Sequence, residues 1–369
     1  MYIEKDFVRI AKRENNTKRS FLIVDPLQGK HIPVSPSKAI CVFSNIAKLI
    51  EKEYKAEKIL IVGFAETATA ISSQIAIDLK CDYIQTTREV VEGSQYLFFS
   101  EEHSHATEQK LVRNGLDEKI NGYDRIIFID DEISTGKTIL NVISSIEIAY
   151  NKKFSYSVAS ILNGMNQDNL DLFKSRNINL HYLVRTNPDE YTAIANEIVV
   201  KNEFDSYVKP DLSSKTTIKS YIFNGLINPR KIVDSCEYNK GCKAFWNQLS
   251  KLNLFEVDSN ILVIGTEEFM YPAMFIGKQL EEKGLKVKFH ATTRSPIVVS
   301  NERTYPLHKR YELRSLYDSD RITYIYDINS YDQVIIVTDA NPISNIGLNS
   351  VVNTLSNRCK KISLIRWSE

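Results

Sequence analysis

Residues 125–140 read RIIFIDDEISTGKTIL, and the order of residue types in this stretch decides the fold of the N-terminal half. The apolar run 126–129 has the length of a buried strand, and it ends in two adjacent carboxylates, Asp130 and Asp131. A short polar loop, 134–138, follows, and an apolar helical pattern begins at Ile139. A strand, a loop and a helix in this order direct backbone N–H groups and a helix dipole at a phosphate.

The loop carries the hydrogen-bond donors that a phosphate needs. Gly136 lets the backbone approach an anion closely. Three hydroxyl side chains add donors: Ser134, Thr135 and Thr138. Because carboxylates repel a phosphate, Asp130 and Asp131 need another partner, and they suit a sugar diol, as an acidic residue does in dinucleotide sites. The whole stretch therefore predicts a ribose-phosphate site.

This stretch resembles the motif with which type I phosphoribosyltransferases bind 5-phosphoribosyl 1-pyrophosphate (PRPP). The resemblance implies that Asp130 and Asp131 hold the ribose hydroxyls and Mg²⁺, and that the loop from Ser134 to Thr138, with Lys137, holds the 5′-phosphate. A nucleotide-triphosphate P-loop is excluded, because that motif requires a glycine five residues before its Gly-Lys, where this chain has Asp131. A polar turn after a buried strand is the remaining alternative.

The composition is that of an ordinary soluble globular protein of two domains, with 369 residues, 43% of them hydrophobic and 25% charged. A net charge of +1 argues against a broad basic face for nucleic acid or an anionic membrane. The charged N-terminus does not resemble a signal peptide, and no apolar run has the length of a membrane span. Five scattered cysteines predict reduced thiols and a cytoplasmic location rather than a zinc site or a disulfide framework.

Apolar runs alternate with helical patterns along the chain, which predicts an α/β fold with a mainly parallel, Rossmann-like sheet. The expected strands cover residues 59–62, 83–85, 96–99, 126–129 and 157–162, and the expected helices cover 68–79 and 139–149. A second α/β series begins at 261–264. The polar, turn-rich stretch 209–215 separates the two series, so we expect one domain over 1–210 and another over 211–369.

The two series share a spacing that indicates an internal repeat. Gly63 and Glu66 are three positions apart, as are Gly265 and Glu268. Each half then has a helix followed by Thr-Thr-Arg, at 86–88 and at 292–294. The second domain is therefore interpreted as a diverged copy that lacks the phosphate loop, because no Thr-Gly-x-Thr follows Asp339. Two generic βαβ units that match by chance are the alternative.

Two more segments of the first half supply candidate site residues. The loop after the strand 59–62, where the resemblance implies pyrophosphate binding, contributes Ala65, Glu66 and Thr67, although Glu66 or Thr67 could equally cap the following helix. Residues 100–107, SEEHSHAT, lie where this family has a mobile catalytic lid. The resemblance implies that His103 or His105 acts on the departing pyrophosphate, beside Arg88. A metal site and a solvated loop are the alternatives.

Near the N-terminus, GKHIP at 29–33 predicts a turn that exposes two cationic side chains. It would cover the substrate base, as N-terminal hood segments do in the resembled family, or be a plain surface turn.

In the second half, GTEEFMY at 265–271 and TTRSP at 292–296 resemble a subfamily in which a phosphoribosyltransferase domain precedes a TRSP domain. Such proteins are related to orotate and purine phosphoribosyltransferases and are encoded in bacterial tellurium-resistance and stress-response gene clusters. Arg294 near Glu268 predicts a second anion or substrate pocket, or an interface ion pair.

The leading hypothesis is an enzyme that uses PRPP and Mg²⁺ to place ribose 5-phosphate on a nucleobase-like acceptor and to release pyrophosphate. We expect it to act as a homodimer, without nucleic acid or membrane. The alternative is a sensor that binds PRPP without turnover.

Overall fold

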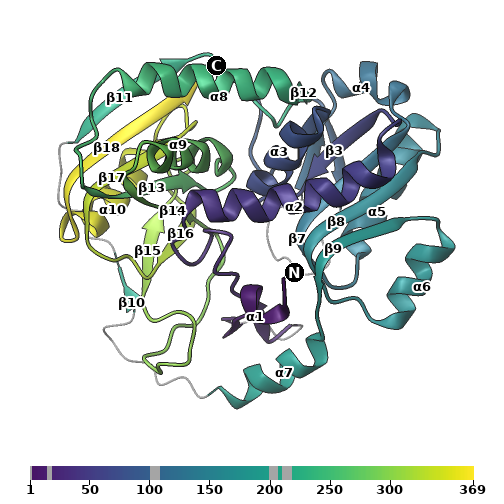
Figure 1. Cartoon of the computed structure of the whole chain (residues 1–369), viewed down its shortest axis with the longest axis horizontal. Coiled ribbons are helices and arrows are strands. Elements are labelled where there is room, and N and C mark those ends of the chain that lie inside the picture. The colour runs from purple at the N-terminus through teal and green to yellow at the C-terminus, as the bar shows by residue number, and fades with distance from the viewer. Residues whose placement is uncertain (1, 15–18, 100–108, 199–206, 210–217) are drawn as a thin grey trace. The chain divides into compact units, whose positions relative to one another are not determined.

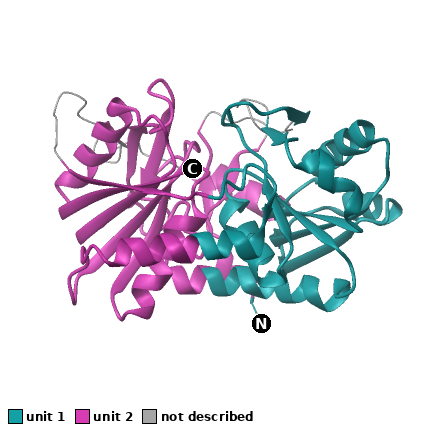
Figure 2. Cartoon of the chain, turned by 90° about the horizontal axis from the view of Figure 1, so that it is seen from above, with its two compact units in different colours: residues 1–2, 40–188, 227–241 teal, residues 3–39, 189–226, 242–369 magenta. Residues whose placement is uncertain are grey.

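The computed structural model describes residues 2–14, 19–99, 109–198, 207–209 and 218–369, and Figure 1 shows the order of their helices and strands. The chain forms two compact units, which Figure 2 distinguishes by colour. Unit 1 comprises residues 1–2, 40–188 and 227–241, and unit 2 comprises 3–39, 189–226 and 242–369. The boundary predicted between residues 210 and 211 stays a prediction, but N-terminal residues 3–39 group with the C-terminal half.

Unit 1 is built on a six-stranded sheet in the order β12-β4-β3-β7-β8-β9. The strands span Val233–Asp234, Asp82–Gln85, Ile59–Gly63, Arg125–Ile133, Ser155–Asn163 and Asn179–Arg185 in that order. All of them are parallel except the short β12 at one edge. The predicted mainly parallel sheet is confirmed.

Helices and a hairpin complete unit 1. They are α2 (Pro36–Tyr54, whose first residues belong to unit 2), α3 (Ala68–Leu79), α4 (Leu116–Lys119), α5 (Lys137–Tyr150) and α6 (Gln167–Ser175), with the antiparallel hairpin of β5 (Tyr96–Phe99) and β6 (Gln109–Val112). The apolar runs 59–62 and 126–129 are entirely buried in β3 and β7, because both strands are central in the sheet. The predicted helix 68–79 coincides with α3.

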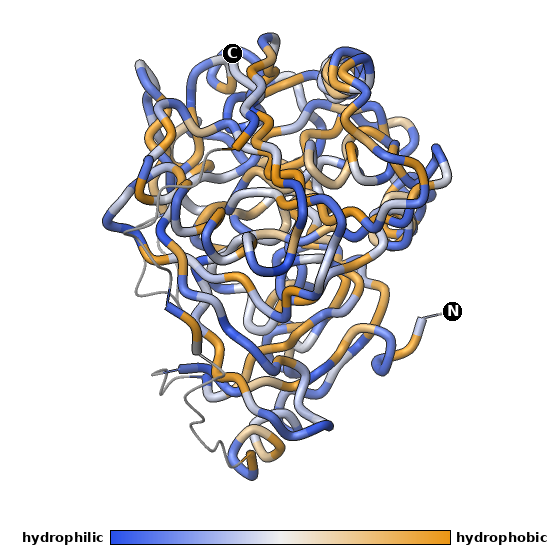
Figure 3. The backbone as a smooth tube through the Cα atoms, turned by 90° about the vertical axis from the view of Figure 1, so that its left-hand side faces the viewer, coloured by the Kyte–Doolittle hydropathy of each residue, from blue (hydrophilic) through white to orange (hydrophobic). Residues whose placement is uncertain are grey.

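Unit 2 has a five-stranded, fully parallel sheet in the order β11-β18-β17-β13-β14. These strands span Lys219–Asn224, Cys359–Ser368, Tyr331–Thr338, Asn260–Thr266 and Lys286–Thr292. The main helices are α7 (Pro188–Glu197), α8 (Ser235–Ser250, which begins in unit 1), α9 (Tyr271–Glu282) and α10 (Asn345–Ser356). Apolar stretches, orange in Figure 3, alternate with polar ones along the chain, as the sequence pattern requires.

Unit 2 also contains smaller elements. They are α1 (Glu4–Phe7), the antiparallel pair β1 (Ile10–Lys12) and β2 (Phe21–Ile23), and the antiparallel hairpin of β15 (Arg310–Arg314) and β16 (Ile322–Tyr326), to which β10 (Tyr207–Val208) adds in parallel. Among the residues described, no helix has both the length and the apolar character needed to cross a membrane.

The two sheets repeat one topology. The order β4-β3-β7-β8 in unit 1 matches β14-β13-β17-β18 in unit 2. In unit 1, Gly63 pairs with Gln85 and Ile129, and in unit 2, Gly265 pairs with Ala291 and Val337. This register places Thr-Thr-Arg 86–88 on Thr-Thr-Arg 292–294, with no shift.

Contacts beyond the sheets repeat as well. Helix α3 packs on β3, β4 and β7, and α9 packs on β13, β14 and β17. Each unit carries a hairpin that pairs with a residue just beyond β4 or β14, through Thr87 with Lys110 and Thr293 with Tyr324. The agreement of order, register and hairpin attachment favours a diverged copy over two generic βαβ units, because generic units share only the strand and helix order.

The Gly-Lys-His-Ile-Pro segment is buried in unit 2, so the predicted exposure of its cations is wrong. Lys30 and His31 are 9% and 3% exposed. Val34, just beyond the segment, pairs with Phe289 on β14, and the ring of His31 meets that of Tyr326 edge-on. The segment is buried because its apolar residues pack in unit 2 and its neighbour Val34 pairs with β14. A local pattern of charged residues does not report either contact.

Acid should weaken unit 2 through His31. Burial, with the Coulomb effects of Lys30, His290 and Arg13, holds the pKa of His31 well below its ordinary value. Among the residues that the structure describes, neither ring nitrogen has a hydrogen-bond partner. The folded protein therefore keeps this ring neutral while the unfolded chain takes up a proton below about pH 6.5, so the free energy of unfolding falls as the pH drops below that value.

We expect His31→Leu to raise the free energy of unfolding at pH 7 by about 1–3 kcal/mol, because it removes an unsatisfied buried polar group. The variant should also lose less stability than the wild type between pH 7 and pH 5. Urea denaturation at both pH values measures this. An equal loss in the two proteins would show that His31 is not a buried neutral ring.

Candidate functional site

The two acids of the predicted ribose-phosphate motif lie at the carboxyl end of β7. The strand continues through them to Ile133, four residues beyond the predicted end of the apolar run, and both acids are half-buried. The backbone N–H of Asp131 donates to Oδ1 of Asp130 at 2.9 Å. Because successive strand residues face opposite sides, the two carboxylates flank the strand end rather than form a side-by-side pair.

The loop that was predicted to bind phosphate is shorter than expected, because α5 begins at Lys137 and already contains Thr138 in its first turn. Gly136 precedes the helix with φ +74°. A Cβ there would lie 2.4 Å from the Phe173 ring and 2.7 Å from Met165 Cε. Only glycine therefore fits, for its left-handed backbone and for its lack of a side chain. The N–H of Lys137 donates to Thr135 Oγ1 at 3.3 Å. The first turn of a helix directs its N–H groups toward an anion.

The predicted pyrophosphate loop lies between β3 and α3, next to the acids. The N–H of Phe64 donates to the carbonyl of Ile129 at 3.0 Å, and Ile129 immediately precedes Asp130. Three loop residues are buried: Ala65, Glu66 and Thr67. Thr67 holds the N-cap position of α3, but its side chain makes no capping hydrogen bond, so the capping alternative finds no support there. The Ala65–Glu66 peptide is cis.

Gln109 holds this loop, and sequence reasoning missed it. Its Nε2 donates to the carbonyl of Ala65 at 2.7 Å, and its Oε1 accepts from the Thr86 hydroxyl. Thr86 Oγ1 in turn accepts from the Ala65 N–H at 2.8 Å. No sequence pattern marks Gln109, because its role arises where β6 meets the end of β4.

Arg88 follows β4 at the same edge of the sheet and is half-buried. It is placed by Thr86, whose N–H donates to Gly63 at 2.8 Å, and by the pairing of Thr87 with Lys110. His103 and His105 lie outside the described residues, as does the whole segment 100–107. Their assignment stays a prediction from the sequence.

In unit 2, the predicted pair Glu268 and Arg294 lies together at the carboxyl ends of β13 and β14. Arg294 Nη2 is 3.9 Å from Glu268 Oε1, and the two side chains are 15% and 1% exposed. A shorter ion pair joins Arg294 Nε to Glu267 Oε2 at 2.7 Å. The sequence pattern indicated Glu268 but not Glu267, which makes the shorter ion pair. Beside them, Tyr317 donates to Asp339 at 2.6 Å, so Asp339 also belongs to this end of the sheet.

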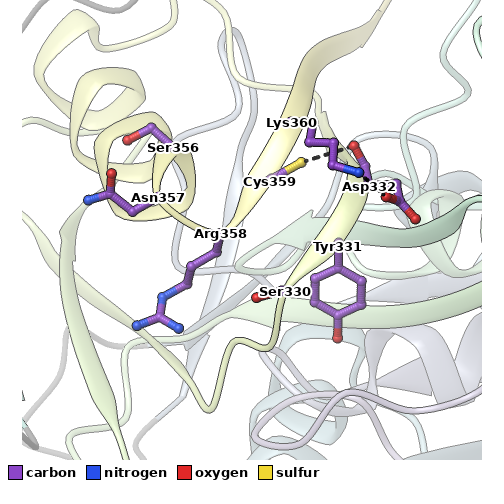
Figure 4. Close-up of a pocket in the computed structure, with 8 residues that line it drawn as sticks. All are labelled: Ser330, Tyr331, Asp332, Ser356, Asn357, Arg358, Cys359 and Lys360. Atoms are coloured by element: carbon purple, nitrogen blue, oxygen red, sulfur yellow. Dashed lines mark hydrogen bonds and ion pairs between the residues drawn. The ribbon is translucent and has the colours of Figure 1, made fainter.

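A surface pocket of about 430 Å³ occurs elsewhere in unit 2 (Figure 4). It is lined by Ser330, Tyr331, Asp332, Ser356, Asn357, Arg358, Cys359 and Lys360. These residues lie at the amino ends of β17 and β18. Because open α/β sheets bind ligands at the carboxyl ends of their strands, this pocket does not belong to either candidate site.

The acids of unit 1 suit Mg²⁺ delivered with a phosphorylated ligand. Within the described part of the chain, no three His, Cys, Asp or Glu residues gather to hold a metal ion. Mg²⁺ is usually bound by one or two carboxylates together with substrate phosphates rather than by an all-protein cage. Asp130 and Asp131 therefore fit this mode of binding.

Two family models match the chain. Residues 7–187 match a model described as phosphoribosyl transferase, and residues 234–355 match one described as the TRSP domain C-terminal to it. The chain belongs to the phosphoribosyltransferase family, with a C-terminal TRSP domain. It is accordingly an enzyme of the pentosyltransferase class, and its general reaction is PRPP-dependent phosphoribosyl transfer.

Solved structures resemble about half of this phosphoribosyltransferase. Adenine phosphoribosyltransferase from Trypanosoma brucei is 18% identical over 49% of this chain and 77% of that one, with a TM-score of 0.35. The enzyme of the same name from Rhodothermus marinus is 16% identical over 49% and 96%, also at 0.35. UMP synthase from Leishmania donovani is 17% identical over 52% and 36%, at 0.32. A comparison with curated proteins finds no match.

We expect Gln109→Ala to lower the turnover number of this phosphoribosyltransferase roughly 10- to 100-fold, because the loop 64–67 would lose its support and shift. As a positioning residue, Gln109 should affect kcat more than the KM for PRPP. The matched control is Gln95→Ala, an exposed glutamine just before β5. Steady-state kinetics test this, and equal effects of the two substitutions would contradict it.

Proposed function

We propose that this phosphoribosyltransferase transfers ribose 5-phosphate from PRPP to a ring nitrogen of a nucleobase-like acceptor. The C1′–oxygen bond to pyrophosphate breaks, a C1′–nitrogen bond forms, and the acceptor nitrogen loses its proton. The observation that carries the proposal is the hydrogen bond between Phe64 and Ile129, since it brings the loop 64–67 beside Asp130 and Asp131.

Each side chain has a separate task in this proposal. Asp130 and Asp131 accept hydrogen bonds from the ribose diol. The 5′-phosphate is received by the loop and the first turn of α5, which supply Ser134, Thr135, Gly136, Lys137 and Thr138. When bound with PRPP, Mg²⁺ neutralises negative charge on the leaving pyrophosphate.

The pyrophosphate is received by the loop that contains Ala65, Glu66 and Thr67, with Arg88 supplying positive charge. His103 and His105 are proposed to act on the departing pyrophosphate from the lid. His103→Ala and His105→Ala should then lower turnover more than PRPP affinity.

The acceptor can be found with purified protein, PRPP and MgCl₂. Adenine, hypoxanthine, guanine, uracil and orotate are offered separately, and pyrophosphate release and the mass of the nucleotide product are recorded. A nucleotide formed with one base and lost in Asp130→Asn/Asp131→Asn supports the proposal. Calorimetric PRPP binding without pyrophosphate release from any base would favour the sensor instead. The cytoplasmic location and the homodimer remain predictions, which fractionation and light scattering test.

A further inference from the structure

Glu267 is a buried carboxylate at the carboxyl end of β13 in unit 2. Its side chain is 2% exposed. Arg294 Nε lies 2.7 Å and Arg321 Nη1 lies 2.9 Å from the same oxygen, Oε2. The Ser315 hydroxyl donates to the other oxygen, Oε1, at 2.5 Å. Two guanidinium groups and a hydroxyl thus surround one anionic group from two segments of the chain, the residues after β14 and the turn between β15 and β16.

The backbone of Glu267 is strained into this position. Its φ is +50°, in the left-handed region that non-glycine residues rarely adopt. Such strain persists only where the surroundings determine it, and it concentrates at functional sites. The strained backbone and the ion pairs together indicate that the surrounding contacts fix the position of this carboxylate. Its position is not a chance result of surface charge.

The internal repeat shows which residue of unit 1 is equivalent to Glu267. The N–H of Glu267 donates to Thr292 Oγ1 at 3.1 Å, as the N–H of Ala65 donates to Thr86 Oγ1 at 2.8 Å. Because Gly63 and Gly265 have equivalent register, Glu267 is the counterpart of Ala65. Unit 1 has only the methyl group of Ala65 at this position of its proposed pyrophosphate loop, whereas unit 2 has the carboxylate of Glu267.

We propose that Arg294, Arg321 and Ser315 form an oxyanion-binding site in unit 2, and that Glu267 is its resident anion. Paired arginines around one oxyanion are the arrangement with which proteins hold phosphate and carboxylate groups. With Glu267 in place the site excludes a phosphate or pyrophosphate group, so the wild-type chain binds one PRPP, in unit 1. This inference does not depend on which acceptor unit 1 uses or on whether it turns over.

Removal of the resident anion should open the site to an external one. We expect Glu267→Ala to bind inorganic phosphate at least tenfold more tightly than the wild type at this site, which calorimetry in a phosphate-free buffer measures. The phosphate stoichiometry should rise by one per chain. Phosphate should also raise the Tm of Glu267→Ala far more than that of the wild type, because a ligand that binds only the folded state stabilises it.

Matched variants separate this site from the phosphate loop of unit 1, which is present in every protein tested. Glu268→Ala removes a neighbouring carboxylate that is equally buried but 3.9 Å from Arg294, and it should gain no phosphate site. The double variant Glu267→Ala/Arg321→Ala should not bind the additional phosphate, because it lacks one of the two guanidinium groups of the site.

If Glu267→Ala is too unstable for calorimetry, Glu267→Gln keeps the side-chain volume and should show the same phosphate-dependent rise in Tm. The proposal is overturned if neither Glu267 variant responds to phosphate more than the wild type, or if Glu268→Ala responds equally.

Discussion

Asp131→Asn is expected to weaken PRPP binding roughly 100-fold and to leave the Tm nearly unchanged. The half-buried carboxylate at the end of β7 accepts hydrogen bonds from the ribose diol in the proposed site, and a hydrogen bond to a charged group contributes about 1.5–3 kcal/mol. An amide keeps the shape but loses the charge and one acceptor. Stability should change little, because the side chain supports the ligand rather than the sheet.

Isothermal titration with PRPP and MgCl₂ measures the effect of Asp131→Asn. The control is Asp124→Asn, the same chemical change just before β7, at the opposite end of the strand. We expect Asp124→Asn to bind PRPP like the wild type. PRPP binding by Asp131→Asn that matches this control would remove Asp131 from the ribose site.

Gly136→Ala should lower the free energy of unfolding by about 2–5 kcal/mol and abolish PRPP binding. A left-handed conformation costs a non-glycine residue about 1–2 kcal/mol, and overpacking a well-packed core costs about 1–3 kcal/mol more. Both apply, since φ is +74° and the new Cβ would meet the buried ring of Phe173. The loop would have to move to relieve the contact, and the phosphate donors would move with it.

Gly93→Ala is a matched control for this prediction. Its φ is +67°, but a Cβ there would meet no atom within 4 Å. We expect Gly93→Ala to lower the free energy of unfolding by only the cost of the left-handed backbone, about 1–2 kcal/mol. It should bind PRPP like the wild type. Urea denaturation of the two variants separates strain from packing. If the two variants lose the same free energy of unfolding, the ring of Phe173 moves to accommodate the added methyl group.

Residues 125–140 alone predicted the buried strand that ends in two acids and the helix that follows, because these depend on local periodicity and residue type. The exact end of the phosphate loop was not predicted, since α5 begins at Lys137 and the donors of Lys137 and Thr138 belong to its first turn. Helix starts depend on backbone hydrogen bonds that a hydrophobic pattern reports poorly.

The sequence by itself determined the α/β class, the repeat of Thr-Thr-Arg and the nearness of Arg294 to an acid, because these follow from local periodicity and from comparison of the two halves. Only the tertiary structure decided which acid is nearest to Arg294, that Gln109 holds the loop at Ala65, and that His31 is buried in unit 2. Each of these facts rests on segments far apart in the chain that meet after folding. The spacing of residues in the sequence does not predict such contacts, because the burial and the hydrogen-bond partners of a residue depend on the segments that pack against it.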